Sequence, residues 1–256
     1  LTLASPGMSI APLAYFALVP MLLSIPLTQK GFFTGWVFGA VYFIINLRWV
    51  EVAVSEFGGS PYFVGIMVTV VFGCLLGLFW GVFGWIYKRK RGHNLLLAGV
   101  IVALEVVRST ALTGLPILNL AHTQYTFTPA IQIAEITGEF GISLIIAYVN
   151  ISIVSLINDR NKQSILFAGV LLIASISYGY MVKNRDYAGN ELNVRLIQPA
   201  YSQADKWNPE LKYDITTLVS QMVRRVQLDN YDLLMLPETA FPAFLNSDFT
   251  GYHVLD

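Results

Sequence analysis

Six apolar runs recur between the start of the chain and about Val182, and each is long enough to cross a lipid bilayer, which takes about 20 residues. They cover residues 9–26, 31–50, 62–87, 95–112, 139–157 and 163–182. Only 12% of the 256 residues are charged, about half the share found in soluble domains. This composition excludes a disordered chain and a nucleic-acid binder with a basic face, and it predicts a polytopic α-helical membrane bundle.

The charges between the runs predict which helix ends share a side of the membrane. Basic residues gather in the breaks 27–30, 88–94 and 158–162, whereas the breaks 51–61 and 113–138 contain no Lys or Arg. Because positively charged loops stay in the cytoplasm, the basic breaks are expected inside, and the other two, with everything after Lys183, outside. Residues 1–8 are then also outside, so we expect one further membrane helix to precede them.

Two sets of glycines four residues apart predict close helix packing. The sets are Gly31, Gly35 and Gly39, and Gly73, Gly77 and Gly81. Each set gives its helix a smooth stripe that a neighbouring helix can approach closely. Packing within the bundle explains the stripes better than a dimer interface. The single cysteine, Cys74, lies among these glycines and is interpreted as a packing residue. One cysteine also excludes a disulfide framework and a zinc or iron–sulfur cluster built from this chain alone.

The composition changes after Lys183, where the pattern predicts a small α/β region. Residues 192–198 (LNVRLIQ) alternate apolar and polar side chains, 209–228 have helical spacing, and 231–236 (YDLLML) form a second apolar run. A strand, a helix and a strand of these lengths predict a βαβ unit with parallel strands. We therefore expect two domains: a transmembrane bundle over 1–190 and an incomplete α/β domain over 191–256.

Glu238 is the strongest candidate for chemistry, because it directly follows the second predicted strand in LPETAFP. Parallel sheets place their ligands at this edge, and Pro237 and Pro242 stiffen the loop. A carboxylate there suits a general base, although it could also cap a following helix or simply face water. Trp207 follows the first strand; it is either an interfacial anchor or part of an acyl-chain groove.

Glu105 and Arg108 lie one turn apart inside an apolar run, where charged groups are expensive and usually have a purpose. They are interpreted as a pair that holds the bundle together, with a direct substrate role as the alternative. His122 and Gln124 fall in the break 113–138. A histidine without a second His or Cys nearby is a poor metal site. No metal and no cofactor are predicted.

Four stretches, in this order, resemble the signatures of the bacterial apolipoprotein N-acyltransferases. They are WVEVAVSEFGGSP at 49–61, ALEVVRSTALTGLPILNLAHTQY at 103–125, IQPAYSQADKW at 197–207 and DLLMLPETAFP at 232–242. The resemblance covers nearly the whole chain, and its last two stretches are the more specific. Val107, Leu115 and Ile117 stand where the family pattern favours aromatic residues.

The resemblance implies a membrane bundle followed by the start of a periplasmic α/β nitrilase-like (αββα) domain, in the bacterial inner membrane. It implies a phospholipid acyl donor, a cysteine thioester, and transfer to the α-amine of the diacylglyceryl-cysteine of an apolipoprotein. By resemblance, Glu238 is the base of a Glu–Lys–Cys triad and Trp207 handles substrate beside it. No cysteine follows Glu238, so we expect the lysine and the nucleophile beyond Asp256, and this chain to be inactive alone.

Two other functions are compatible with the residues. A transporter or channel with a small outer domain would need paired ionisable residues facing one cavity, or interrupted helices in corresponding halves; the sequence has Glu105 and Arg108 but no internal repeat. A non-catalytic scaffold that binds lipoproteins is the third possibility. The expected partners are membrane lipids and lipoproteins rather than nucleic acid.

Overall fold

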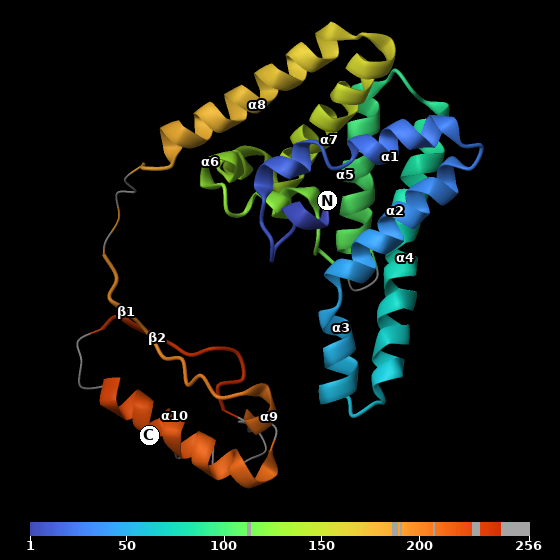
Figure 1. The fold of residues 1–256 in the computed structure, drawn as a ribbon. Coiled ribbons are helices and arrows are strands. Elements are labelled where there is room, and N and C mark those ends of the chain that lie inside the picture. Colours follow the sequence, from blue (N-terminus) through green and yellow to red (C-terminus); the bar gives the residue numbers. More distant parts are fainter. Residues whose placement is uncertain (112–113, 186–188, 190, 207, 227–230, 242–256) are drawn as a thin grey trace. The chain divides into compact units, whose positions relative to one another are not determined.

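The computed structural model describes residues 1–111, 114–185, 189, 191–206, 208–226 and 231–241, and it divides into two compact units (Figure 1). The first unit is Leu1–Arg185 and the second is Asp186–Asp256. The first unit is helical, whereas the second combines a pair of strands with helices.

Among the described residues, five long helices build the first unit. They are α2 (Gly31–Asn46), α4 (Tyr62–Arg89), α5 (Asn94–Thr110), α7 (Ala134–Asp159) and α8 (Lys162–Val182). The shorter elements are η1 (Thr2–Ala4), η2 (Ala11–Tyr15), α1 (Val19–Ser24), η3 (Ile25–Leu27), α3 (Trp49–Val52), η4 (Ala53–Phe57), η5 (Leu120–Gln124) and α6 (Thr128–Ile131).

Fewer helices than the six predicted runs are long and apolar enough to cross a membrane. In the described part of the chain these helices are α4, α7 and α8. A fourth span is present if α2 and the helical segment Trp49–Phe57, which is bent by 53° against α2, cross the membrane together. The helix α5 has only 17 residues. The prediction of a helical membrane bundle is therefore confirmed, whereas six continuous spans are not observed.

The first predicted run, 9–26, is broken because it contains three prolines. Pro12, Pro20 and Pro26 each lie in the first turn of a short element, η2, α1 and η3 respectively. The side chain of Asn150 in α7 compensates for one break: its Oδ1 accepts from Leu18 N at 2.9 Å, and its Nδ2 donates to Ala14 O at 2.8 Å. In an unbroken helix those two backbone groups would bond each other. The fully buried amide thus satisfies groups that lipid could not.

The predicted glycine stripes are confirmed as the contact between α2 and α4, which lie side by side (Figure 1). A Cβ added to Gly77 would lie 2.7 Å from the backbone N of Ala40, and one added to Gly39 would lie 2.7 Å from Trp80 Cδ1. Such distances are shorter than a van der Waals contact. The helices can therefore approach this closely only because glycine has no side chain.

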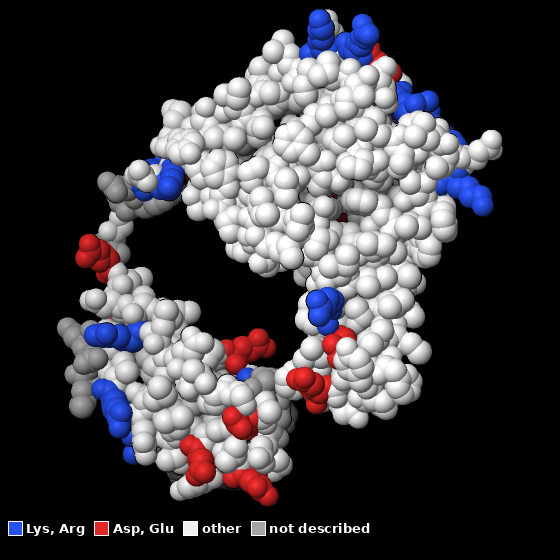
Figure 2. Space-filling model, viewed as in Figure 1, with Lys and Arg blue, Asp and Glu red and all other residues white. Residues whose placement is uncertain are grey.

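The three basic breaks meet at one end of the first unit. Lys88, at the end of α4, donates to the carbonyl oxygen of Thr28 in the break before α2. Arg91 from the α4–α5 turn and Asp159, the last residue of α7, line one common pocket. Figure 2 shows Lys and Arg gathered at this end of the first unit, with a wide uncharged surface below them. This arrangement agrees with three turns on one side of a membrane.

The second unit contains the predicted parallel strands. β1 (Val194–Leu196) pairs with β2 (Leu233–Met235) in the register Val194↔Leu233. The elements between them are α9 (Gln203–Lys206), η6 (Pro209–Leu211) and α10 (Lys212–Val226). The strand–helix–strand prediction is confirmed, whereas two strands do not establish a complete nitrilase-like domain.

The helix α10 covers the strands with one apolar face. Its buried residues are Ile215, Val219 and Val223, which pack with Ile197 from the end of β1. Leu218, the residue before the fully buried Val219, is 44% exposed and lies outside this face.

Candidate functional site

Glu238 lies where the sequence predicted, in the loop that follows β2. Its side chain is exposed at the carboxyl end of the two parallel strands, three residues after Met235. This is the edge where parallel α/β folds place reacting groups. The next residue, Thr239, has a φ of 51°, so the backbone turns sharply here and Glu238 does not begin a helix.

Two side chains from the segment after β1 fasten this loop. The hydroxyl of Tyr201 donates to the carbonyl oxygen of Ala240, and burial raises the pKa of Tyr201 above its ordinary value. Tyr201 therefore keeps its proton at neutral pH and remains a donor. Lys206 Nζ lies 3.5 Å from the carbonyl oxygen of Glu238 and also contacts the hydroxyl of Thr239. The Glu238 backbone is thus tied to the neighbouring segment of the sheet edge.

Trp207, the predicted substrate-handling residue, lies outside the described residues, as does Pro242. Its neighbour Lys206 ends α9 and contacts the Glu238 loop. The placement of Trp207 beside Glu238 therefore stays a prediction.

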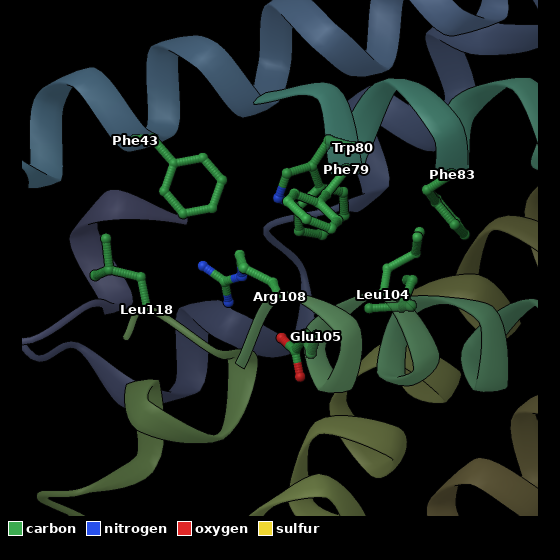
Figure 3. Close-up of a pocket in the computed structure, with 9 residues that line it drawn as sticks. Phe43, Phe79, Trp80, Phe83, Leu104, Glu105, Arg108 and Leu118 are labelled. Atoms are coloured by element: carbon green, nitrogen blue, oxygen red, sulfur yellow. The ribbon is translucent and has the colours of Figure 1, made fainter. Parts of the chain in front are cut away.

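Glu105 and Arg108 on α5 are both buried in the first unit, with 6% of each exposed. From the sequence we interpreted them as a pair that holds the bundle together, but no ion pair joins their side chains in the described residues. Instead, Glu105 Oε1 accepts from the backbone N of Leu120 at 2.7 Å, and Arg108 Nη2 donates to Asn119 Oδ1. Figure 3 shows the two side chains pointing to different sides of α5. Each charge holds the segment after α5 against the bundle.

Asn119 extends this network to α7. Its Nδ2 donates to Glu139 Oε1 at 3.1 Å, and the other carboxyl oxygen, Oε2, lies 2.7 Å from His122 Nε2. The side chain of Gln124, which is fully buried, donates to Ala11 O at 3.0 Å. The segment predicted as a plain outer loop is therefore a packed 3₁₀ turn whose polar groups are mostly satisfied.

The sequence analysis did not identify Asn119 and Glu139 as members of this hydrogen-bond network. The available signal was the position of Glu139 at the very start of the apolar run 139–157, where a carboxylate is costly unless it is bonded. Among the described residues, no group of three or more His, Cys, Asp and Glu side chains is placed to hold a metal ion.

Comparison with known proteins identifies the family of this chain. Residues 1–152 match the family model described as "Apolipoprotein N-acyltransferase N-terminal domain". The chain belongs to the apolipoprotein N-acyltransferase family. The family resemblance predicted from the sequence is thereby confirmed, and its first two stretches, 49–61 and 103–125, lie within the matched residues. Together with the apolar helices, the family makes this a membrane protein.

Curated relatives in the family extend the match into the second unit. The apolipoprotein N-acyltransferase of Geobacter metallireducens is 30% identical over 97% of this chain, and that of Methylococcus capsulatus is 29% identical over 91%. The Chromobacterium violaceum enzyme is 28% identical over 94%. The chain spans about half the length of these relatives, 50%, 49% and 47% respectively.

Proposed function

We propose that this protein is an apolipoprotein N-acyltransferase that uses a phospholipid as acyl donor and the α-amine of a diacylglyceryl-cysteine on an apolipoprotein as acceptor. The observation that carries the proposal is the match to proteins of that name along nearly the whole chain, 97% for the Geobacter metallireducens relative. Nothing in the described residues favours a transporter over this family function.

The reaction divides into two acyl transfers, which replaces one difficult step by two easier ones. A cysteine thiolate attacks the ester carbonyl of the phospholipid; the ester C–O bond breaks, a thioester forms, and the lysophospholipid leaves as an alcohol after taking up a proton. The amine of the acceptor then attacks the thioester, the C–S bond breaks, and an amide forms. The thiolate is restored, and the amine proton passes to a base.

Glu238 is the base in this proposal, taking the thiol proton in the first step and the amine proton in the second. Its exposed carboxylate on a loop fastened by Tyr201 and Lys206 supports this role. Trp207 is proposed to contact the substrate beside it. The nucleophile is not Cys74, because this residue lies inside α4 between apolar turns. A cysteine and an oxyanion-stabilising lysine are therefore proposed to follow Asp256, and the 256-residue chain alone to be inactive.

The lipid substrates place this chemistry at a membrane surface. The three basic turns lie at one end of the bundle, and positive turns face the cytoplasm. The proposal therefore puts the protein in the bacterial inner membrane, with the second unit on the periplasmic side.

The test is complementation in a bacterium whose own N-acyltransferase is depleted. The full-length gene, which in this proposal continues beyond the codon for Asp256, is expected to restore N-acylated lipoprotein, measured by mass spectrometry of the lipoprotein N-terminus. The empty vector is the control and should leave diacylated lipoprotein only. If the expressed protein leaves the N-terminus unacylated, the proposal is wrong and the scaffold function is favoured.

A further inference from the structure

A cavity of about 280 Å³ opens at the end of the first unit where the basic turns meet. It lies between the end of α4, the start of α5 and the end of α7. Figure 1 shows the α4–α5 and α7–α8 connections at this same end of the unit. The volume is just below that of the pockets that hold drug-sized ligands, so the cavity has room for a small solute.

Two opposite charges line the mouth of this cavity. Arg91 comes from the α4–α5 turn, and Asp159 is the last residue of α7. No ion pair joins them, and in the described part of the chain neither forms an ion pair with another side chain. Asp159 receives a hydrogen bond from Ser155 Oγ to its Oδ2 at 3.5 Å, which leaves Oδ1 open. Both charges are therefore accessible to a ligand.

The position of Asp159 is unfavourable without a cation beside it. The last turn of a helix carries partial negative charge on its free carbonyl groups, which repel an acidic side chain. Asp159 ends α7, and the last turn of α7 contains no basic residue. The first turn of a helix carries partial positive charge, and α5 begins at Asn94, three residues after Arg91. The lining is thus negative at the end of α7 and positive at the start of α5.

The floor of the cavity is uncharged and offers hydrogen bonds. Tyr87 and Asn94 lie there, with only 4% and 8% of each exposed. Asn94 Nδ2 donates to Ser164 Oγ at 2.6 Å, whereas Asn94 Oδ1 and the Tyr87 hydroxyl form no hydrogen bond with the described residues. Leu97 and Ile151 add buried apolar surface. The floor can therefore hold either an apolar or an uncharged polar group.

The cavity ends inside the first unit and does not cross it. On α4 and α5 its lining stops at Tyr87 and Leu97, each within one turn of a helix end. Its mouth is formed by exposed residues at the basic turns, among them Arg91 and Asp159. A ligand therefore enters from the aqueous side of these turns and is bound there without a path through the membrane.

We propose that this cavity binds a free α-amino acid with an uncharged side chain. Its carboxylate pairs with Arg91, its ammonium group pairs with Asp159, and its side chain occupies the floor beside Tyr87 and Asn94. A ligand with a single charge would leave one of the two mouth residues unpaired. A charged side chain would find no partner, since the lining residues below the mouth are uncharged. The site is separate from the acyl transfer proposed above and does not depend on it.

Equilibrium dialysis of the 256-residue chain in detergent micelles, with radiolabelled leucine and glutamine, tests this proposal. At least one of the two should bind saturably at one site per chain. For leucine, the competitors are isocaproate, which lacks the ammonium group, and isopentylamine, which lacks the carboxylate; glutamine has the corresponding pair. Each should compete at least about tenfold more weakly, because a hydrogen bond between charged groups is lost. No saturable binding of either amino acid, or equal competition by either analogue, would overturn the proposal.

A third competitor separates a free solute from a lipid headgroup. Glycerophosphoethanolamine has an ammonium group and a phosphate and is the headgroup of a zwitterionic phospholipid without its acyl chains. It should compete more weakly than the unlabelled amino acid. Stronger competition would assign the cavity to a lipid headgroup and would contradict the proposal.

Two variants locate the binding at the mouth. Asp159→Asn should weaken binding of the amino acid at least about tenfold and leave the weak binding of the analogue without an ammonium group unchanged. Arg91→Met should have the converse effect, sparing the analogue without a carboxylate. Both residues are exposed, so neither change disturbs the core. Lys90→Met is the matched control, since Lys90 is an exposed neighbour that does not line the cavity. Unchanged affinity in either mouth variant, or an equal loss in Lys90→Met, would show the site to be elsewhere.

Discussion

Replacing Glu238 by Gln in the full-length protein is expected to lower N-acylation of lipoproteins by at least about 100-fold, because a positioned general acid–base group contributes roughly 10²–10⁴ to a reaction rate. The amide has nearly the same size but cannot take a proton from a thiol or an amine. Its loop should stay in place, since the contacts from Tyr201 and Lys206 go to backbone oxygens and to Thr239 rather than to the carboxylate. The measurement is the fraction of triacylated lipoprotein in the depleted strain, by mass spectrometry.

Glu210→Gln is the matched control for this variant. Glu210 is an exposed acid in η6 of the same unit, and its replacement should leave acylation within about twofold of the parent protein, the range expected of a surface change. Normal acylation by Glu238→Gln would remove Glu238 from the catalytic role. Equal losses in both variants would show that the unit merely needs its negative charge.

Gly35→Ala is expected to cost roughly 3 kcal/mol or more of the free energy of unfolding, at the upper end for overpacked sites. The added Cβ would collide with the backbone carbonyl of Trp80, and this carbonyl cannot move away as a flexible side chain could. The helices α2 and α4 would therefore have to separate along their common stripe. The free energy is measured by denaturant titration of the purified protein in mixed detergent micelles.

Gly99→Ala controls for the change of residue type. A Cβ at Gly99 on α5 would meet nothing within 4 Å, so this variant should be as stable as the parent, or more stable by up to about 1 kcal/mol because alanine favours helices. If Gly35→Ala proves as stable as Gly99→Ala, the close contact between α2 and α4 is wrong.

Patterns that repeat along the chain predicted the fold well. The glycine spacing located the α2–α4 contact, because a period of four residues leaves one helix face without side chains. The alternation of basic and non-basic breaks predicted turns that the structure gathers at one end. The strand–helix–strand region was also predicted, because period-two and helical spacing are local properties of the sequence.

Features that depend on contacts between distant residues could not be predicted. Asn150 satisfies the backbone of the proline-broken segment 132 residues away from Leu18, and no local pattern reveals this. The spacing of Glu105 and Arg108 suggested a pair, but each finds a better partner in the segment after α5. The catalytic role of Glu238 stays a proposal, which rests on its place after a strand and on the resemblance to the family's sequence stretches.

The side of the membrane that carries Glu238 is the most direct test of this account. Two reporters are fused in turn after Asn161 and after Lys183. Alkaline phosphatase is active only in the periplasm. Green fluorescent protein fluoresces only in the cytosol, because it does not fold correctly after export in the unfolded state. Fusions after Asn161, in a basic turn, should fluoresce, and those after Lys183 should show phosphatase activity. Fluorescence without phosphatase activity after Lys183 would place Glu238 in the cytosol, away from the proposed acceptor, and would contradict the account.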